Sequence, residues 1–129
     1  MYRLCLLARL SLVAAPAAAQ TDWRQAREVD VLLSNLDIEP ETIRRRAGEP
    51  VRLRFVNSSH IPHSFSAGGF FKAGQYRNRD KAAVGGGSVE VGPGDTREGG
   101  LVPAKGRYSA RCSNLFHRIM GMSARIIVE

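Results

Sequence analysis

The chain has 129 residues and a formal net charge of +7, from 19 basic and 12 acidic side chains. This length suits one domain with one hydrophobic core. Two cysteines are too few for a disulfide-stabilised scaffold, and the basic residues are too dispersed to predict a nucleic-acid-binding protein.

The N-terminal residues are typical of a secretory signal peptide. Arg3 supplies a positive charge, residues 4–15 are mostly apolar, and residues 17–19 read Ala-Ala-Ala, which fits an A-x-A cleavage site. The apolar run is shorter than the roughly 20 residues that a membrane span needs. We therefore expect residues 1–19 to be a cleaved signal peptide and residues 20–129 to be a single periplasmic domain with no membrane span. The alternative is an N-terminal helix of the folded domain.

Loss of this segment changes the charge and the cysteine content. Arg3 and Arg9 leave with it, so the mature chain has 17 basic and 12 acidic residues and a net charge of +5. A surface of this charge favours acidic partners or anionic surfaces. Cys5 also leaves, and Cys112 remains as the only cysteine of the mature chain. An odd cysteine in an exported protein predicts a reactive thiol, an intermolecular disulfide or a metal ligand.

The mature sequence is typical of an all-β protein. It has no long segment with the 3.6-residue period of a helix, and short alternating runs are separated by turn signals. These runs predict strands within residues 28–35, 42–46, 51–57, 63–67, 98–102, 107–112 and 122–129, and a strand followed by a turn within residues 88–96. We expect a hairpin-like corner at residues 47–50 and an irregular excursion with at most a short helix at residues 68–87. About eight short strands predict a two-sheet Greek-key sandwich.

The alternation also predicts which side chains face the core. Val51, Leu53 and Phe55 alternate with arginines, so we expect them to point inward. By the same rule, Cys112 points inward at the end of its strand, and Met122 points inward where the last strand begins.

Sulfur and imidazole side chains gather in two short segments. His63 lies in the first, and Cys112, His117, Met120 and Met122 lie in the second. Two histidines, one cysteine thiolate and a weakly bound methionine are the ligands of a blue-copper electron-transfer site. Met122 is continuous with an alternating strand that fixes its direction, so we assign it as the axial ligand and Met120 to the apolar rim.

Residues 38–129 resemble the cupredoxins, the family of plastocyanin and azurin. The resemblance rests on "IEPETIRRRAGEPVRLRFVN", on "PHSF" and on "YSARCSNLFHRIMGMSARIIV". It implies a cupredoxin-like Greek-key β-sandwich that holds one mononuclear copper ion through His63, Cys112, His117 and Met122. The loop spacing is C-x4-H-x4-M, which resembles the auracyanins and differs from plastocyanin (C-x2-H-x4-M) and azurin (C-x4-H-x3-M).

Residues around the ligands receive roles from the same resemblance. Ser64 stands where plastocyanin has an asparagine that connects the two ligand loops, and a serine hydroxyl could make an equivalent bond. Asn57 ends the strand before the first ligand loop. An apolar electron portal is expected around the exposed edge of the His117 ring, formed by Ile61, Leu115 and Phe116.

Three further segments are assigned to the surface or the core. We expect His60 to be exposed to solvent and not to bind metal. The run from Arg44 to Arg46 is expected to form a solvated face, with a docking patch as the alternative. Phe70 and Phe71 are expected to lie in the core beneath the long excursion.

The predicted function is that of an exported blue copper protein that carries single electrons between redox partners. The sequence shows no general base, nucleophile or open coordination position, so we do not expect an enzyme. We expect a monomer whose redox partners are acidic proteins. The alternative is a copper-binding carrier or buffer that delivers copper in the periplasm, because both functions need the same ligands.

Overall fold

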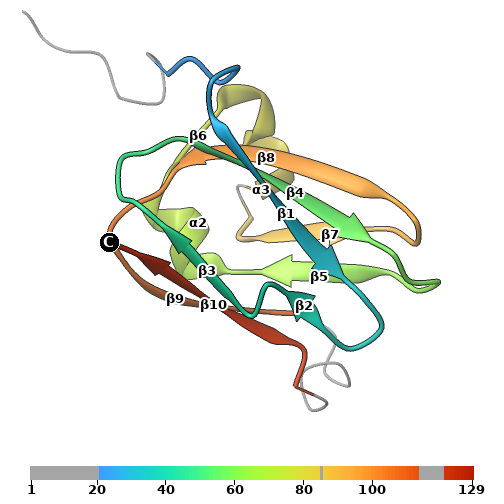
Figure 1. The fold of residues 1–129 in the computed structure, drawn as a ribbon. Coiled ribbons are helices and arrows are strands. Elements are labelled where there is room, and N and C mark those ends of the chain that lie inside the picture. Colours follow the sequence, from blue (N-terminus) through green and yellow to red (C-terminus); the bar gives the residue numbers. More distant parts are fainter. Residues whose placement is uncertain (1–20, 85, 114–120) are drawn as a thin grey trace, which may run out of the picture.

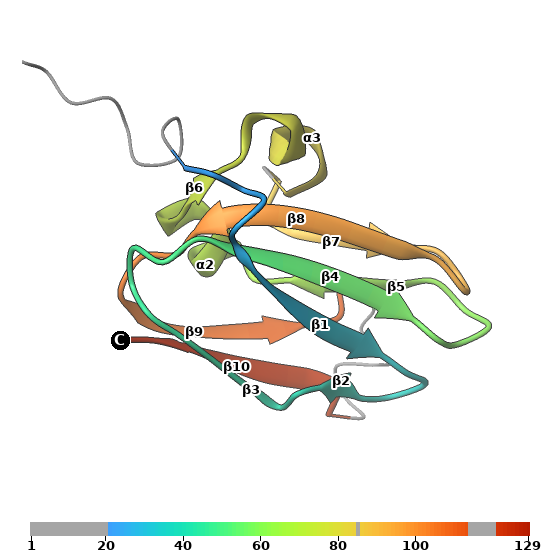
Figure 2. The ribbon, with the colours of Figure 1, turned by 45° about the horizontal axis from the view of Figure 1, so that its top comes forward.

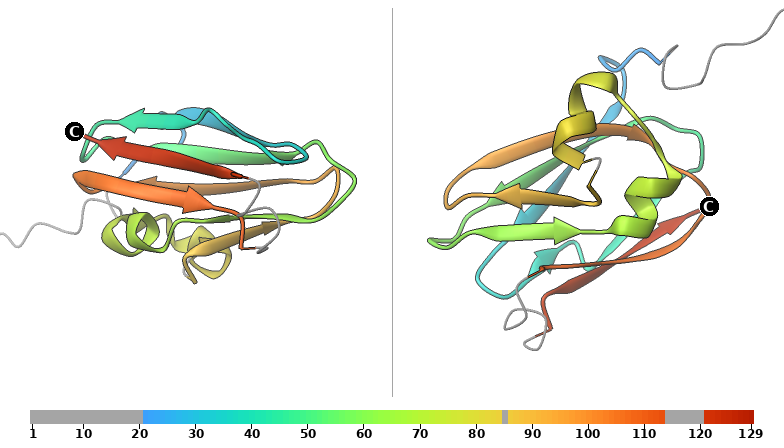
Figure 3. Two further views of the ribbon diagram at one scale, coloured as in Figure 1. Left: turned by 90° about the horizontal axis from the view of Figure 1, so that it is seen from below. Right: turned by 180° about the vertical axis from the view of Figure 1, so that it is seen from behind.

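The protein is a two-layer β-sandwich (Figure 1). The computed structural model describes residues 21–84, 86–113 and 121–129, so the predicted signal peptide at residues 1–19 lies outside the described residues. In the described part of the chain, one sheet has the strand order β2-β1-β4-β8-β6 and the other has the order β3-β10-β9-β5-β7. Figure 3 shows the layers from below and from behind.

Ten strands in the described residues confirm the predicted all-β sandwich. The first sheet contains β1 (Arg27–Leu33), β2 (Ile38–Glu39), β4 (Val51–Asn57), β6 (Gln75–Tyr76) and β8 (Thr96–Val102). The second sheet contains β3 (Thr42–Arg45), β5 (His63–Ser66), β7 (Ser88–Val91), β9 (Gly106–Arg111) and β10 (Ser123–Val128). The count exceeds the predicted eight because β2 and β6 have only two residues each, too few to show an alternating pattern.

The connection at residues 47–50 crosses between the sheets. The predicted hairpin-like corner is wrong in its pairing, because β3 pairs with β10 whereas β4 pairs with β1 and β8. Gly48 has a φ of +80°, a left-handed conformation that glycine adopts without a steric penalty. The turn therefore passes the chain from one layer to the other.

The excursion after β5 is more helical than predicted. It contains α2 (Gly68–Ala73), a 3-10 turn (Asn78–Asp80), and α3 (Lys81–Val84). These elements are too short to show helical periodicity in the sequence. Phe70 and Phe71 anchor α2, with 1% and 0% of their surface exposed, which confirms their predicted place in the core. No helix in the described residues is long and apolar enough to cross a membrane.

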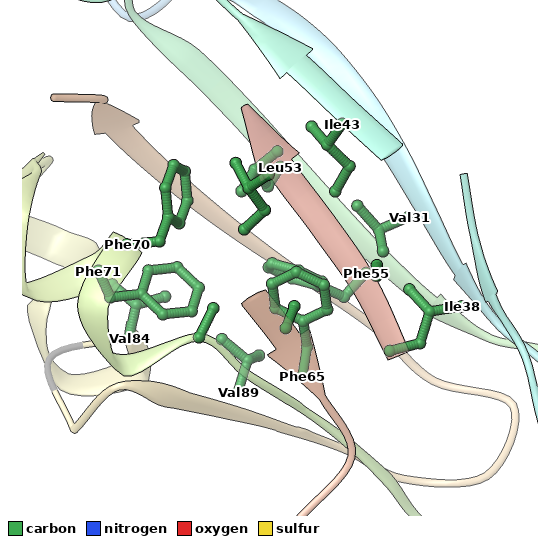
Figure 4. Packing of buried hydrophobic residues seen from close by; sticks show 14 of the residues in the cluster. Val31, Ile38, Ile43, Leu53, Phe55, Phe65, Phe70, Phe71, Val84 and Val89 are labelled. Atoms are coloured by element: carbon green, nitrogen blue, oxygen red, sulfur yellow. The ribbon is translucent and has the colours of Figure 1, made fainter. Parts of the chain in front are cut away.

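The core lies between the two sheets and beneath α2 (Figure 4). Val51, Leu53 and Phe55 of β4 are buried as predicted, while the arginines between them lie on the outer face. The Phe55 ring lies 4.8 Å from the ring of Phe65 on β5, centroid to centroid. Burial of each such ring contributes about 1.5–3 kcal/mol to the stability of the fold. The contact fixes β5 against the opposite sheet.

The parallel strand pairs define two ends of the sandwich (Figure 2). β1 runs parallel to β4, from Arg27 at one end to Leu33 beside Asn57 at the other. β3 runs parallel to β10, so Arg45 lies beside the last residues of β10. We call the end that contains Asn57 and the start of β10 the site end, and the opposite end the distal end. A strand rises about 3.3 Å per residue, so the two ends are about 20 Å apart.

Candidate metal centre

Cys112 and Met122 form a cross-strand pair at the site end. The β9–β10 register pairs Arg111 with Ser123, and the next step along the two strands brings Cys112 beside Met122. The Cys112 N–H donates to the Met122 carbonyl at 3.4 Å. Only 1% of Cys112 and 0% of Met122 are exposed. Both side chains therefore belong to the interior, as the alternation predicted, and directly paired residues have their Cβ atoms about 4.5–5.5 Å apart.

His63 enters the same region from the neighbouring strand. It is the first residue of β5, which lies next to β9 in the sheet, and Ser66 of β5 is opposite Arg111 of β9. The antiparallel register carries the start of β5 past the end of β9, toward Cys112. His63 is 1% exposed. Three adjacent strands, β5, β9 and β10, thus bring an imidazole, a thiol and a thioether to one buried end of the sandwich.

Ser64 links the two segments that carry the predicted ligands. Its hydroxyl donates to the Cys112 sulfur at 3.7 Å and lies 2.7 Å from the Ser113 hydroxyl. The Ser113 N–H also donates to the Ser64 oxygen, at 2.7 Å. A serine hydroxyl has one proton, so these contacts are all satisfied when the Ser113 hydroxyl donates to Ser64 and Ser64 donates to sulfur. The Ser64 hydroxyl therefore bonds to the segment that carries Cys112, as the sequence analysis allowed.

Asn57 fixes the loop that precedes His63. Its amide group donates to the Ile61 carbonyl at 2.8 Å and to the Val91 carbonyl at 3.0 Å. Its oxygen accepts from the Ser59 N–H at 2.9 Å and from the Ser59 hydroxyl at 2.7 Å. Asn57 is 1% exposed, and a buried amide with all these bonds is a rigid connector. It joins β4 of one sheet to the end of β7 in the other.

The exposed surface of the site end is partly apolar. Ile61 is 44% exposed and Leu32, near the end of β1, is 40% exposed. They are the exposed large hydrophobic residues among those that the structure describes. His60 is also exposed, as predicted. The site end therefore combines a buried donor set with an apolar element on its surface.

Four predicted residues lie outside the described residues: Leu115, Phe116, His117 and Met120. Within the described residues, no cluster of three or more His, Cys, Asp and Glu side chains is found. His63 and Cys112 are only two residues of these types, because methionine is not one of them. Imidazole nitrogen and two kinds of sulfur are ligands that copper prefers, so the donor set fits that metal.

Sequence reasoning did not identify Ser59 and Ser113. Ser59 follows Asn57 in an Asn-Ser-Ser turn, a sequence that commonly forms side-chain-to-backbone hydrogen bonds, so a local signal was present. Ser113 is 49 residues from Ser64, and only the sheet register brings the two hydroxyls together.

Several solved structures share this fold. The reduced auracyanin of the photosynthetic bacterium Roseiflexus castenholzii matches with a TM-score of 0.60 at 17% sequence identity, over 81% of this chain and 98% of that chain. Auracyanin B matches with a TM-score of 0.55 at 20% identity, over 81% and 89% of the two chains. Auracyanin A, a "blue" copper protein of Chloroflexus aurantiacus, matches with a TM-score of 0.55 at 17% identity, over 79% and 99%. No family model and no curated protein matches the sequence. The predicted cupredoxin resemblance is confirmed for the fold.

Proposed function

On this cupredoxin fold, we propose that the protein binds one copper ion through His63, Cys112, His117 and Met122 and carries single electrons between redox proteins. The observation that supports it best is the burial of His63, Cys112 and Met122 where three adjacent strands, β5, β9 and β10, begin or end at one end of the sandwich. Bound copper would supply the one-electron couple. The sulfur and imidazole donors suit both of its oxidation states.

The surrounding residues have defined tasks under this proposal. The Ser64 hydroxyl stabilises negative charge on the Cys112 sulfur and holds it in position through Ser113. Asn57 keeps the His63 loop in place. Burial of the donors keeps water away from the metal, while exposed Ile61 gives a partner protein an apolar contact close to the site. We place the electron portal at the His117 edge, with Leu115, Phe116 and Met120 around it.

The proposal includes export, because residues 1–19 combine a positive charge, an apolar run and an Ala-Ala-Ala segment in the order typical of a secretory signal peptide. Cleavage after Ala19 would release residues 20–129 into the periplasm. The mass of the protein recovered from a periplasmic fraction checks this cleavage.

The visible spectrum of the copper-loaded mature chain tests the copper site. Addition of one equivalent of Cu(II) should give an intense thiolate-to-copper charge-transfer band. The Cys112→Ser variant should lose the band, because the hydroxyl cannot replace the thiolate. Ser109→Ala, an exposed substitution on the same strand β9, should keep it. A colourless Cu(II) complex of a chain with an intact thiol would contradict the proposal.

Two rates distinguish electron transfer from copper carriage, the alternative predicted from the sequence: the rate of electron self-exchange and the rate of copper release. An electron carrier should exchange electrons rapidly with its own reduced form and release copper slowly to a chelator. Release within seconds together with slow self-exchange would identify a carrier.

A further inference from the structure

The positive charge of the protein is distributed unevenly over its surface. On the outer face of the first sheet, charges neutralise one another through ion pairs that include Arg54 with Asp30 at 2.9 Å and Arg77 with Asp80 at 2.6 Å. This face has three arginines and four carboxylates: Arg52, Arg54, Arg77, Glu28, Asp30, Asp80 and Glu98. It therefore contributes none of the excess positive charge.

The site end also has no positive excess among the described residues. Its strand ends and turns carry five carboxylates and three arginines: Asp37, Glu39, Glu41, Glu90, Asp95, Arg97, Arg111 and Arg125. The expectation of an acidic redox partner came from net charge alone, and the described residues place little of that charge near the candidate metal centre.

The distal end carries six basic and two acidic residues. They come from the starts of β1 and β9, the end of β3 and the adjoining turns: Arg27, Arg44, Arg45, Arg46, Lys105, Arg107, Glu49 and Glu129. Arg27 and the run from Arg44 to Arg46 line one recess together with the two glutamates. The arginine run is thus part of a basic surface formed by both sheets, which we call the distal basic surface.

The two glutamates leave most of the positive charge of the distal basic surface available to a binding partner. Glu129 lies 3.6 Å from Arg44, with their side chains 77% and 67% exposed, and Glu49 lies 4.0 Å from Arg46. Exposed pairs of this kind contribute about 0–1 kcal/mol and are readily exchanged. Arg27 and Arg45 form no ion pair with any residue that the structure describes.

The composition of this surface distinguishes between two kinds of anionic partner. Protein interfaces have an apolar centre, often with aromatic anchors. The exposed large hydrophobic residues of the described chain, Leu32 and Ile61, both lie at the site end, about 20 Å away. An anionic lipid surface needs only clustered basic residues. The distal basic surface therefore fits lipid headgroups better than it fits a protein.

We propose that the distal basic surface binds a membrane surface that contains anionic phospholipids. Bound in this way, the sandwich stands with its site end directed away from the bilayer. Exposed Ile61 and the candidate metal centre then remain accessible to a redox protein. The inference rests on surface charge and fold geometry alone, so it stands or falls independently of the copper site.

Vesicle sedimentation of the mature chain tests this inference. The protein should bind phosphatidylcholine vesicles that contain phosphatidylglycerol, should not bind vesicles of phosphatidylcholine alone, and should be released by salt. A triple variant of the distal basic surface, Arg27→Gln, Arg44→Gln and Arg46→Gln, should bind at least about tenfold more weakly, because each basic residue near an anionic membrane contributes on the order of 1 kcal/mol.

A control variant with the same net charge shows whether binding depends on where the arginines lie or only on how many there are. Arg97→Gln, Arg111→Gln and Arg125→Gln remove three exposed positive charges from the site end, and this variant should bind nearly as well as the parent chain. Equal losses in the two triple variants would overturn the proposal, and so would failure of the parent chain to bind. Binding to polyglutamate but not to vesicles, dependent on the distal arginines, would assign the surface to an acidic protein instead.

Discussion

Replacement of Asn57 by alanine should destabilise the fold even in the absence of metal. Asn57 is 1% exposed and makes four side-chain hydrogen bonds, two as donor and two as acceptor. Without Asn57, the single proton of the Ser59 hydroxyl can turn to the Ile61 carbonyl, 2.9 Å away, so one bond replaces four and three are lost. At about 1 kcal/mol net for each buried bond, the expected loss is about 3 kcal/mol. A domain of this size has about 5–15 kcal/mol of stability in total.

Urea unfolding of the copper-free chain measures this loss directly. The chain has one tryptophan, Trp23, whose fluorescence can report unfolding. The transition midpoint should move to lower urea with an unchanged slope, because the unfolded chain exposes the same surface. Asn35→Ala is the control, since Asn35 is exposed in the turn after β1 and should change stability by less than about 0.5 kcal/mol. Equal effects of the two substitutions would refute the assigned role of Asn57.

Two further predictions concern the axial ligand and alkaline pH. Met122→Leu should raise the reduction potential and shift the visible spectrum, whereas Met120→Leu should change both little; the reverse result would assign the axial position to Met120. Burial raises the pKa of Tyr76 above its ordinary value of 10.0, and its hydroxyl donates to the Phe71 carbonyl. A raised pKa means that the folded protein favours the protonated form of Tyr76. The stability that this preference contributes is present below about pH 10 and is lost as the pH rises through the folded-state pKa. Tyr76→Phe should therefore flatten the decline of melting temperature above about pH 10, and an unchanged slope would contradict this.

Local alternation was sufficient to predict the strands and the inward direction of the buried donors. Cys112 and Met122 each continue a strand whose alternate residues are buried, so their orientation follows from a period of two. The same alternation carries no information about which sheet a strand joins. β3 and β4 are separated by a short turn and still belong to different layers, because pairing depends on partners far along the chain.

Other features depend on contacts that no local pattern contains. α2 is a six-residue helix stabilised by the burial of Phe70 and Phe71 against the sandwich, and its own sequence, which begins with two glycines, does not favour a helix. The bond between Ser64 and Ser113 likewise exists only because β5 and β9 are neighbours.

The sheet itself positions three of the four proposed ligands. His63 begins β5, Cys112 directly follows β9 and Met122 directly precedes β10; the three strands are neighbours in one sheet, and their backbone pairing sets the separations of the three residues. Gly121, two residues before β10, has a φ of +86°, a left-handed conformation that glycine adopts without a steric penalty. A donor set held by sheet hydrogen bonds changes little when the charge of a bound ion changes. Under the proposed function, strand order therefore supplies the rigidity that electron transfer requires.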